Sequence, residues 1–282
     1  MKIILFGATG NLGKAIAIEL KQQGYEITAV VRNNVKLNVL GSIADKIITA
    51  DVTNPKDLID ICIGYDIVIS SLGKSVSPND KSKPTFHEID YIGNSNILNE
   101  AVKSRIKKFV YISAFHSEKY LHLEYFKAHH EFSEKLISSG LNYSIIKPPA
   151  IFSAFIDMIE MAKKGQLVNI GLGDKKTNPI YEGDLAKICI SSFSEQKSII
   201  EVGGKNIYTR KQLNEIVQNA INPNKSIKKI PLVLFKCLLP ILKFFDKNSF
   251  DKFAFFIEVM QHDTIAPQLG SMTFEEYVRM KK

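Results

Sequence analysis

Short apolar runs alternate with amphipathic segments along the first half of the chain. Continuous apolar runs of this length are typical of strands that are covered on both faces. They predict strands at 1–6, 26–31, 46–52, 66–73, 109–113 and 143–147. Helices are expected between them, at 14–23, from Asn54-Pro55, at 86–104 and at 124–139. This alternation predicts an α/β fold, a doubly wound parallel sheet with helices on both faces.

After residue 150 the predicted elements become shorter and less regular. We expect a helix over 153–164 and a short strand pair within 166–182, with Gly171 and Gly173 in its turn. The next helix should begin near Gly183, with Asp184 as its N-terminal cap. Two later helices are expected to begin with capping boxes, Thr209-Arg210-Lys211-Gln212 and Thr273-Phe274-Glu275-Glu276.

The first strand leads directly into a glycine-rich turn, Gly7-Ala8-Thr9-Gly10-Asn11-Leu12-Gly13. Gly7 would permit the sharp turn, Gly10 would let a ligand approach the backbone, and Gly13 would let the next helix pack on the strand. The free N–H groups and positive end of that helix favour an anion. Three glycines alone are weak evidence, but their place in a strand-helix-strand unit predicts binding of a dinucleotide through its pyrophosphate.

The residue after the second strand indicates which dinucleotide fits. An acidic residue at this place would bind the ribose hydroxyls of NAD. The chain has Arg32 instead, followed by Asn33, Asn34 and Lys36. Because a guanidinium pairs well with a phosphate, the sequence favours NADP(H) over NAD(H). The alternative is that Arg32 is an ordinary solvated cation of a loop.

Ligands of doubly wound sheets lie beyond the carboxyl ends of the strands. Asp51 is expected to accept a hydrogen bond from the adenine amino group, with Val52 packed on the ring, and the small residues Ser71–Gly73 leave room for ribose and phosphate. The cofactor contacts expected from the strand ends are Gly7, Thr9, Gly10, Asn11, Leu12, Gly13, Arg32, Asp51, Val52, Ser71, Leu72, Gly73, Ser113, Pro148 and Pro149.

These positions also suggest how the chain divides. Residues 1–152 are expected to form the dinucleotide-binding domain, and 178–204 return to it. The remaining segments, 153–177 and 205–282, are expected to form a smaller C-terminal α/β lobe for the substrate.

The net charge of +8 raises the question of nucleic-acid binding. Of the 37 basic residues only four are arginines, and the lysines are scattered along the chain. A reader of phosphates or bases would more often cluster arginine, so we expect no nucleic-acid partner.

Three features bear on the compartment and on metals. Cys62, Cys189 and Cys237 are far apart and form no CxxC pair, which favours neither disulfides nor a metal site and fits a reducing cytoplasm. The N-terminal apolar run is a strand rather than a signal peptide.

The apolar segment 230–245 is too short to span a membrane. It therefore predicts a cover or subunit interface, or else a peripheral membrane contact.

Several segments together resemble the short-chain dehydrogenase/reductase superfamily in its atypical NAD(P)H-binding branch. That branch includes NmrA-like proteins, isoflavone-reductase-like enzymes and the NADPH-binding subunit of respiratory complex I. The resemblance implies a Rossmann-type domain and a nicotinamide cofactor, and it leaves the substrate open. The matching segments are GATGNLG (7–13), DVTNP (51–55), SSLG (70–73), HEIDYIGNSNILNEA (87–101), KFVYIS (108–113), GLNYSIIKPPAIF (140–152) and NPIYEGDLA (178–186).

The chain departs from that superfamily at its catalytic tyrosine. The YxxxK pattern falls on Leu123 and Lys127, so the lysine is present and the tyrosine is not. The resemblance implies that Lys127 binds the nicotinamide ribose or donates the proton itself, unless it only forms an ion pair with Glu131. Ser113 is the matching serine, although a shift of one residue would place Ala114 there. His116 is a further candidate proton donor.

We therefore expect an NADP(H)-dependent oxidoreductase that acts on a small apolar carbonyl, enone or quinone-like compound, as a monomer or homodimer. Two alternatives stay open. One is a non-catalytic NADP(H) sensor or assembly factor of the NmrA type, which the missing tyrosine favours. The other is an isomerase or dehydratase that retains its NAD(P). The spacing of the histidines predicts no metal site, because His122 and His129 are two helical turns apart.

Overall fold

The computed structural model of the chain describes residues 1–32 and 40–282. These residues form two compact units, each with its own core. The first comprises Met1–Lys74, Pro84–Lys147 and Leu185–Ile200, and the second comprises Ser75–Lys83, Pro148–Asp184 and Glu201–Lys282.

The segment Ser75–Lys83 belongs to the second unit, although the sequence suggested that it was part of the first. Its contacts explain this assignment. Ser77 Oγ donates to Asp157 Oδ2 (2.5 Å), and Lys252 Nζ donates to the Asp80 carbonyl (2.6 Å). These bonds attach the segment to two helices of the second unit.

A seven-stranded sheet forms the centre of the first unit, in the order β3-β2-β1-β4-β5-β6-β9. The neighbours from β3 to β6 all pair in parallel. The order reverses beside β1, which pairs with both β2 and β4, and this is where doubly wound sheets bind ligands. The strands are β1 (Lys2–Phe6), β2 (Glu26–Val31), β3 (Lys46–Thr49), β4 (Ile67–Ser70), β5 (Lys108–Ile112), β6 (Tyr143–Lys147) and β9 (Ser198–Glu201). The predicted Rossmann-type sheet is confirmed.

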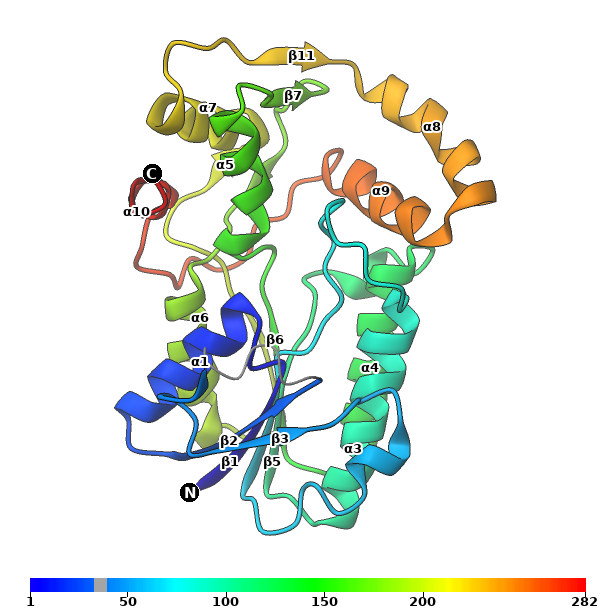
Figure 1. The fold of residues 1–282 in the computed structure, drawn as a ribbon, viewed down its shortest axis with the longest axis vertical. Helices are drawn as coiled ribbons and strands as arrows, with labels where there is room; N and C mark the ends of the chain where they lie inside the picture. The colour runs from blue at the N-terminus through cyan, green and yellow to red at the C-terminus, as the bar shows by residue number, and fades with distance from the viewer. Residues whose placement is uncertain (33–39) are drawn as a thin grey trace. The chain divides into compact units, whose positions relative to one another are not determined.

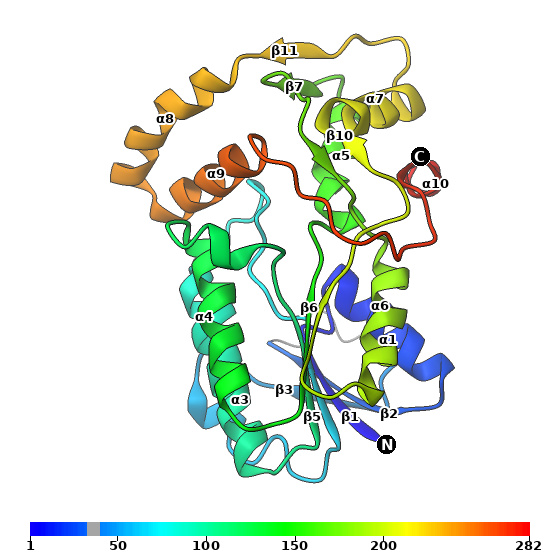
Figure 2. The same cartoon turned by 180° about the vertical axis from the view of Figure 1, so that it is seen from behind.

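Helices cover both faces of this sheet (Figures 1 and 2). On one face lie α1 (Asn11–Gln22) and α6 (Glu182–Ser191), and on the other lie α3 (Asn94–Lys103) and α4 (Glu124–Ser138). Each helix turns an apolar stripe toward the strands. In α4 this stripe includes Phe132 and Leu136, which join Phe109 and Tyr111 of β5 in one core.

Two predicted helices of the first unit differ in form. The helix expected over 86–104 begins as a π-helix, His87–Gly93, and continues as α3. Asn94 accounts for the wider turn, because its Nδ2 donates to the Asp90 carbonyl (3.0 Å) and its Oδ1 accepts from Ser70 Oγ (2.5 Å). The helix expected from Asn54-Pro55 is a single 3-10 turn, Pro55–Leu58.

The second unit is built mainly from helices around a core that contains Phe152, Phe274 and Tyr277. Its helices are α5 (Ile156–Lys163), α7 (Arg210–Ile221), α8 (Leu232–Phe245), α9 (Lys247–Val259) and α10 (Phe274–Met280). Helices α8 and α9 follow one another along the chain and pack together (Figure 1).

The strand pair expected within 166–182 is wrong. β7 (Val168–Ile170) pairs in parallel with β11 (Lys228–Ile230), and β8 (Lys176–Thr177) pairs with β10 (Tyr208–Thr209). The glycine turn between β7 and β8 is bonded to distant segments instead of folding back on itself. The Gly171 N–H donates to the Ile230 carbonyl (2.9 Å), and the Gly173 carbonyl accepts from the Lys211 N–H (2.9 Å).

The predictions for helix starts are partly confirmed. Thr209 and Thr273 form complete capping boxes at the starts of α7 and α10. Asp184 is not an N-terminal cap, because α6 begins at Glu182 and Asp184 lies within its first turn. Its carboxylate instead accepts from the backbone N–H groups of Ser271 (2.7 Å) and Met272 (3.0 Å).

Candidate functional site

The glycine turn between β1 and α1 has two positions where only glycine fits. Gly7 adopts φ +80°, and a Cβ there would lie 2.7 Å from the Ser71 carbonyl group. A Cβ on Gly13 would lie 2.1 Å from the Gly7 carbonyl oxygen. These close approaches join the start of α1 and the end of β4 to the turn. Ser71 adds to this contact, because its Oγ donates to the Phe6 carbonyl (3.1 Å).

Gly10 has a different role, because it is the N-cap residue of α1 and is exposed. A Cβ there would meet only the Gly7 carbonyl oxygen, at 3.4 Å. No side chain caps α1, and its first turn contains no acidic residue. The first N–H groups of a helix have no partner within the helix and carry partial positive charge. The start of α1, with Asn11 exposed and Leu12 buried, is therefore suited to hold an anion such as a diphosphate.

The ends of the neighbouring strands place other expected cofactor residues beside this turn. Arg32 follows β2 directly and is exposed. Asn33, Asn34 and Lys36 lie outside the described residues. At the end of β4, Leu72 is half-buried and Gly73 is exposed. Thr9, within the turn, is half-buried.

Asp51 and Val52 lie after β3, and their own bonds fix them in place. Asp51 Oδ1 accepts from the backbone N–H (2.9 Å) and the hydroxyl (2.8 Å) of Thr53. Val52 is buried in the core of the first unit, and its carbonyl accepts from Asn96 Nδ2 (2.9 Å). Pro148 and Pro149 belong to the second unit.

The three candidate catalytic residues each have partners of their own. Ser113 is buried, with its Oγ 3.1 Å from Ser133 Oγ. Lys127 is exposed, with its Nζ 3.9 Å from Glu131 Oε1, the ion pair that the spacing suggested. Position 123, where the superfamily has its tyrosine, is a buried leucine at the N-cap of α4.

His116 lies in a group of charged side chains after β5. It adopts φ +57°, and its Nε2 is 3.1 Å from Lys119 Nζ. Its Nδ1 is 3.5 Å from Glu118 Oε1, and Glu118 also accepts from Lys147 Nζ (3.3 Å). His116 is therefore part of a polar network with Glu118, Lys119 and Lys147.

The sequence reasoning missed a buried carboxyl group beside the end of β4. Asp90, on the π-helix, is fully buried, and its Oδ1 accepts from the Lys74 N–H (2.9 Å). Its Oδ2 has no hydrogen-bond partner among the described residues. Burial raises the pKa of Asp90 well above its ordinary value, because a charged carboxylate is poorly solvated there. A Cβ on Gly73 would lie 3.2 Å from Oδ1, so Asp90 directly supports the segment expected to contact the cofactor.

A buried pair of aromatic side chains connects β5 with α4. His129 Nδ1 lies 2.6 Å from the Tyr111 hydroxyl, and the His129 ring packs edge to face against Tyr125. Burial lowers the pKa of His129 to about 3 and raises that of Tyr111 well above its ordinary value. Both groups are therefore neutral over the physiological range. The spacing of Tyr125, His129 and Phe132 along one helical face was the signal for this cluster.

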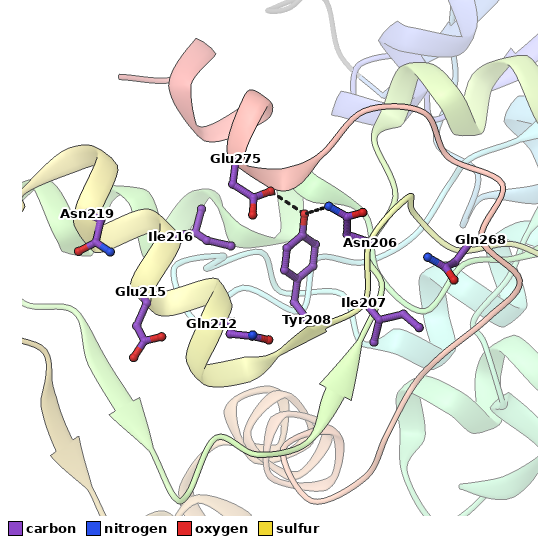
Figure 3. Close-up of a pocket in the computed structure, with 9 residues that line it drawn as sticks. All are labelled: Asn206, Ile207, Tyr208, Gln212, Glu215, Ile216, Asn219, Gln268 and Glu275. Carbon is purple, nitrogen blue, oxygen red and sulfur yellow. Dashed lines mark hydrogen bonds between the residues drawn. The ribbon is translucent and has the colours of Figure 1, made fainter.

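A pocket of about 520 Å³ lies within the second unit (Figure 3). Tyr208 is its central side chain, donating to Glu275 Oε2 (2.6 Å) and accepting from Asn206 Nδ2 (3.3 Å). Burial, with the bond to Glu275, raises the pKa of Tyr208 to about 12. Gln212 also lines the pocket, and its side chain accepts from the Thr209 N–H. These polar groups hold the starts of α7 and α10 rather than forming a reactive site.

Two further properties of residues 1–32 and 40–282 bear on the expectations about membranes and metals. No helix within them is both long and apolar enough to cross a membrane. No cluster of three or more histidine, cysteine or acidic side chains in these residues is arranged to hold a metal ion.

Comparisons with known proteins agree with this geometry. The photosystem II assembly factor Ycf39 of Trieres chinensis is 24% identical over 288 residues, covering 100% of this chain and 88% of the factor. The chloroplastic divinyl chlorophyllide a 8-vinyl-reductase of Arabidopsis thaliana is 26% identical over 267 residues, covering 86% of this chain and 63% of the reductase. The crystal structure of Citrobacter sp. triphenylmethane reductase with NADP(H) has a TM-score of 0.75 at 16% identity and covers 100% of both chains.

The sequence profile of a family described as NAD(P)H-binding matches residues 7–196, from the first glycine of the turn to the segment before β9. This match covers more than half of the chain and includes the whole edge of the sheet described above. The chain therefore belongs to the NAD(P)H-binding family and has the Rossmann-like fold of the atypical short-chain dehydrogenases/reductases.

Proposed function

We propose that the chain is an NADP(H)-dependent reductase of a small apolar carbonyl, enone or quinone-like compound. The observation that carries the proposal is the start of α1, where Gly10 has neither a capping side chain nor an acidic neighbour in the first turn. A bound nicotinamide would supply the hydride. The chain would supply the diphosphate site at Gly7–Gly13 and the walls formed by Ser71–Gly73 and Asp51–Val52.

Arg32 supports the preference for NADP(H), because an exposed guanidinium after β2 can pair with the 2′-phosphate. Arg32→Asp should weaken binding of NADPH by about tenfold or more, since hydrogen bonds to charged groups contribute about 1.5–3 kcal/mol. Binding of NADH should be unchanged or stronger. Titration calorimetry with both cofactors measures the ratio, and Arg279→Asp in the second unit serves as a charge-matched control. An unchanged ratio in Arg32→Asp would refute the preference.

Lys127 is the strongest of the three candidate catalytic residues. Its Nζ is exposed, and 3.9 Å to Glu131 is long for a hydrogen-bonded ion pair, so its donors can still reach a cofactor ribose. The Ser113 hydroxyl is 3.1 Å from Ser133 Oγ, inside the fold. We therefore propose that Lys127 binds the ribose or donates a proton, with Ser113 and His116 as secondary candidates.

A role as an assembly factor is the second proposal. Two observations favour it: Leu123 at the tyrosine position, and the match to Ycf39 along the whole chain. The two roles differ in turnover. The reductase should oxidise NADPH when carbonyl, enone and quinone compounds are supplied. An assembly factor should bind NADPH, leave it unoxidised with every compound, and change its partners with the redox state of the cofactor.

An isomerase or dehydratase that retains its cofactor would convert substrate without net oxidation of NADPH.

A cytoplasmic location stays a prediction, and the Arabidopsis thaliana relative is named chloroplastic. A monomeric or homodimeric state also stays a prediction.

Cys62 and Cys189 are buried, and burial raises the pKa of each to about 12, so both remain unreactive thiols.

A further inference from the structure

The outer face of α8 (Leu232–Phe245) is apolar and exposed, although the helix belongs to a folded unit. None of its side chains is buried. Phe244 and Phe245, at its C-terminal end, are 83% and 78% exposed. The other exposed large apolar residues of the helix are Val233, Leu234, Leu238 and Ile241.

At 100° per residue, these six side chains and the exposed Cys237 share one side of the helix. The opposite side packs on α9, where the Phe235 ring lies 6.4 Å from the rings of both Phe253 and Phe256. An ordinary surface helix turns its apolar side inward and its charged side outward. In α8 the side of the helix that these seven side chains share contains no charged residue.

Lysines flank this face along the chain. Lys228 and Lys229 lie just before the helix, and Lys247 lies just after it. Lys236 and Lys243 lie on the side turned to α9, where Lys236 Nζ donates to Gln261 Oε1 (2.7 Å) and Lys243 Nζ lies 5.8 Å from the centre of the Phe250 ring. The segment 228–252 contains six lysines and two aspartates.

Both aspartates serve α9 itself. Asp246 caps it by accepting from the Ser249 N–H (3.2 Å), and Asp251 accepts from Lys247 Nζ (3.0 Å). The charge next to the apolar face is therefore positive.

We propose that the outer face of α8 binds the surface of a membrane that contains anionic lipids. The helix has 14 residues, so it is about 21 Å long and can lie in the plane of the interface, where its apolar side enters the acyl region and the lysines before and after it meet the headgroups. A second copy of the chain fits less well, since an isologous contact would bring the flanking lysines of the two copies near one another.

Binding of the full chain to vesicles tests this proposal. Flotation should recover the protein with vesicles of phosphatidylcholine and phosphatidylglycerol, and binding should weaken with added salt. Phe244→Gln combined with Phe245→Gln should weaken binding by about tenfold or more, since each phenylalanine removes apolar area from water. Lys228→Gln combined with Lys229→Gln should weaken binding to anionic vesicles in particular. Leu172→Gln is the matched control, because Leu172 is 85% exposed but lies outside α8.

Each result decides the question. Equal flotation of the wild type and the double phenylalanine variant would overturn the proposal, as would no flotation of the wild type. A dimer in solution that the phenylalanine variant abolishes, without vesicle binding, would assign the face to a second copy instead. All variants should keep the melting temperature and NADPH affinity of the wild type, which separates this test from that of the proposed reductase.

Discussion

The start of α1 in the first unit and the starts of α7 and α10 in the second unit differ in how their backbone N–H groups are satisfied. At the start of α7, Thr209 Oγ1 accepts from the Gln212 N–H (3.1 Å) and Gln212 Oε1 accepts from the Thr209 N–H (2.7 Å). At the start of α1, Gly10 provides no such partner. The chain thus satisfies donors with its own side chains at the start of α7, and leaves them available at the start of α1, where we propose that the cofactor binds.

The same contrast extends to buried groups. Asp184, in the second unit, accepts from two backbone N–H groups and from the Ser271 hydroxyl (2.6 Å). Asp90, in the first unit, has one carboxyl oxygen with no partner among the described residues. Because an unpaired buried polar group is costly, the position of Asp90 beside the end of β4 favours a functional rather than a structural constraint there.

Gly13→Ala should have the largest effect on this comparison. The new Cβ would lie 2.1 Å from the Gly7 carbonyl oxygen, which is backbone and cannot rotate away. We expect a loss of about 3 kcal/mol in the free energy of unfolding, together with loss of NADPH binding. Urea denaturation and calorimetry measure the two effects. If this variant were as stable as the wild type, α1 could not pack on the glycine turn as closely as described.

Asp90→Asn should change how stability depends on pH. Burial raises the pKa of Asp90 above its ordinary 3.8, so its contribution is fully present below pH 3.8 and is lost as pH rises toward the native pKa. Each unit of difference between the native and unfolded pKa corresponds to about 1.4 kcal/mol. The variant cannot ionise, so its melting temperature should rise relative to that of the wild type as the pH increases above 3.8. Parallel curves would mean that Asp90 is charged in the native state.

Thr209→Ala should have the smallest effect, and it probes the structural side of the comparison. Loss of the capping box should cost about 1 kcal/mol of stability. NADPH affinity should not change, because the donors at α7 serve the fold. Thr209→Ser, which keeps the hydroxyl, is the matched control. A fall in NADPH affinity in Thr209→Ala alone would remove the distinction between the two kinds of helix start.

The sequence was informative where structure depends on neighbours along the chain. The strands from β1 to β6, the starts of α7 and α10 and the turn at Gly7–Gly13 follow from local hydrophobic patterns and residue chemistry. Family membership also followed from short segments in the right order.

The sequence was less informative where a segment far away along the chain determines the local structure. The partner of β7 is β11, some 60 residues away, and no pattern within 166–182 reveals it. The π-helix depends on the side chain of Asn94 and on Ser70 of β4. No local pattern marks Asp90, and its full burial depends on packing that only the fold brings together.

The most direct test of the central claim is a calorimetric titration of the cofactor-free wild type and Gly10→Ala with NADPH. The substitution suits the fold, since φ at Gly10 is −72° and the new Cβ meets only the Gly7 carbonyl oxygen at 3.4 Å. We predict that the wild type binds NADPH and that Gly10→Ala binds it at least about tenfold more weakly, with a melting temperature close to that of the wild type. Equal affinities in the two proteins, or no heat from the wild type with either NADPH or NADH, would contradict the account.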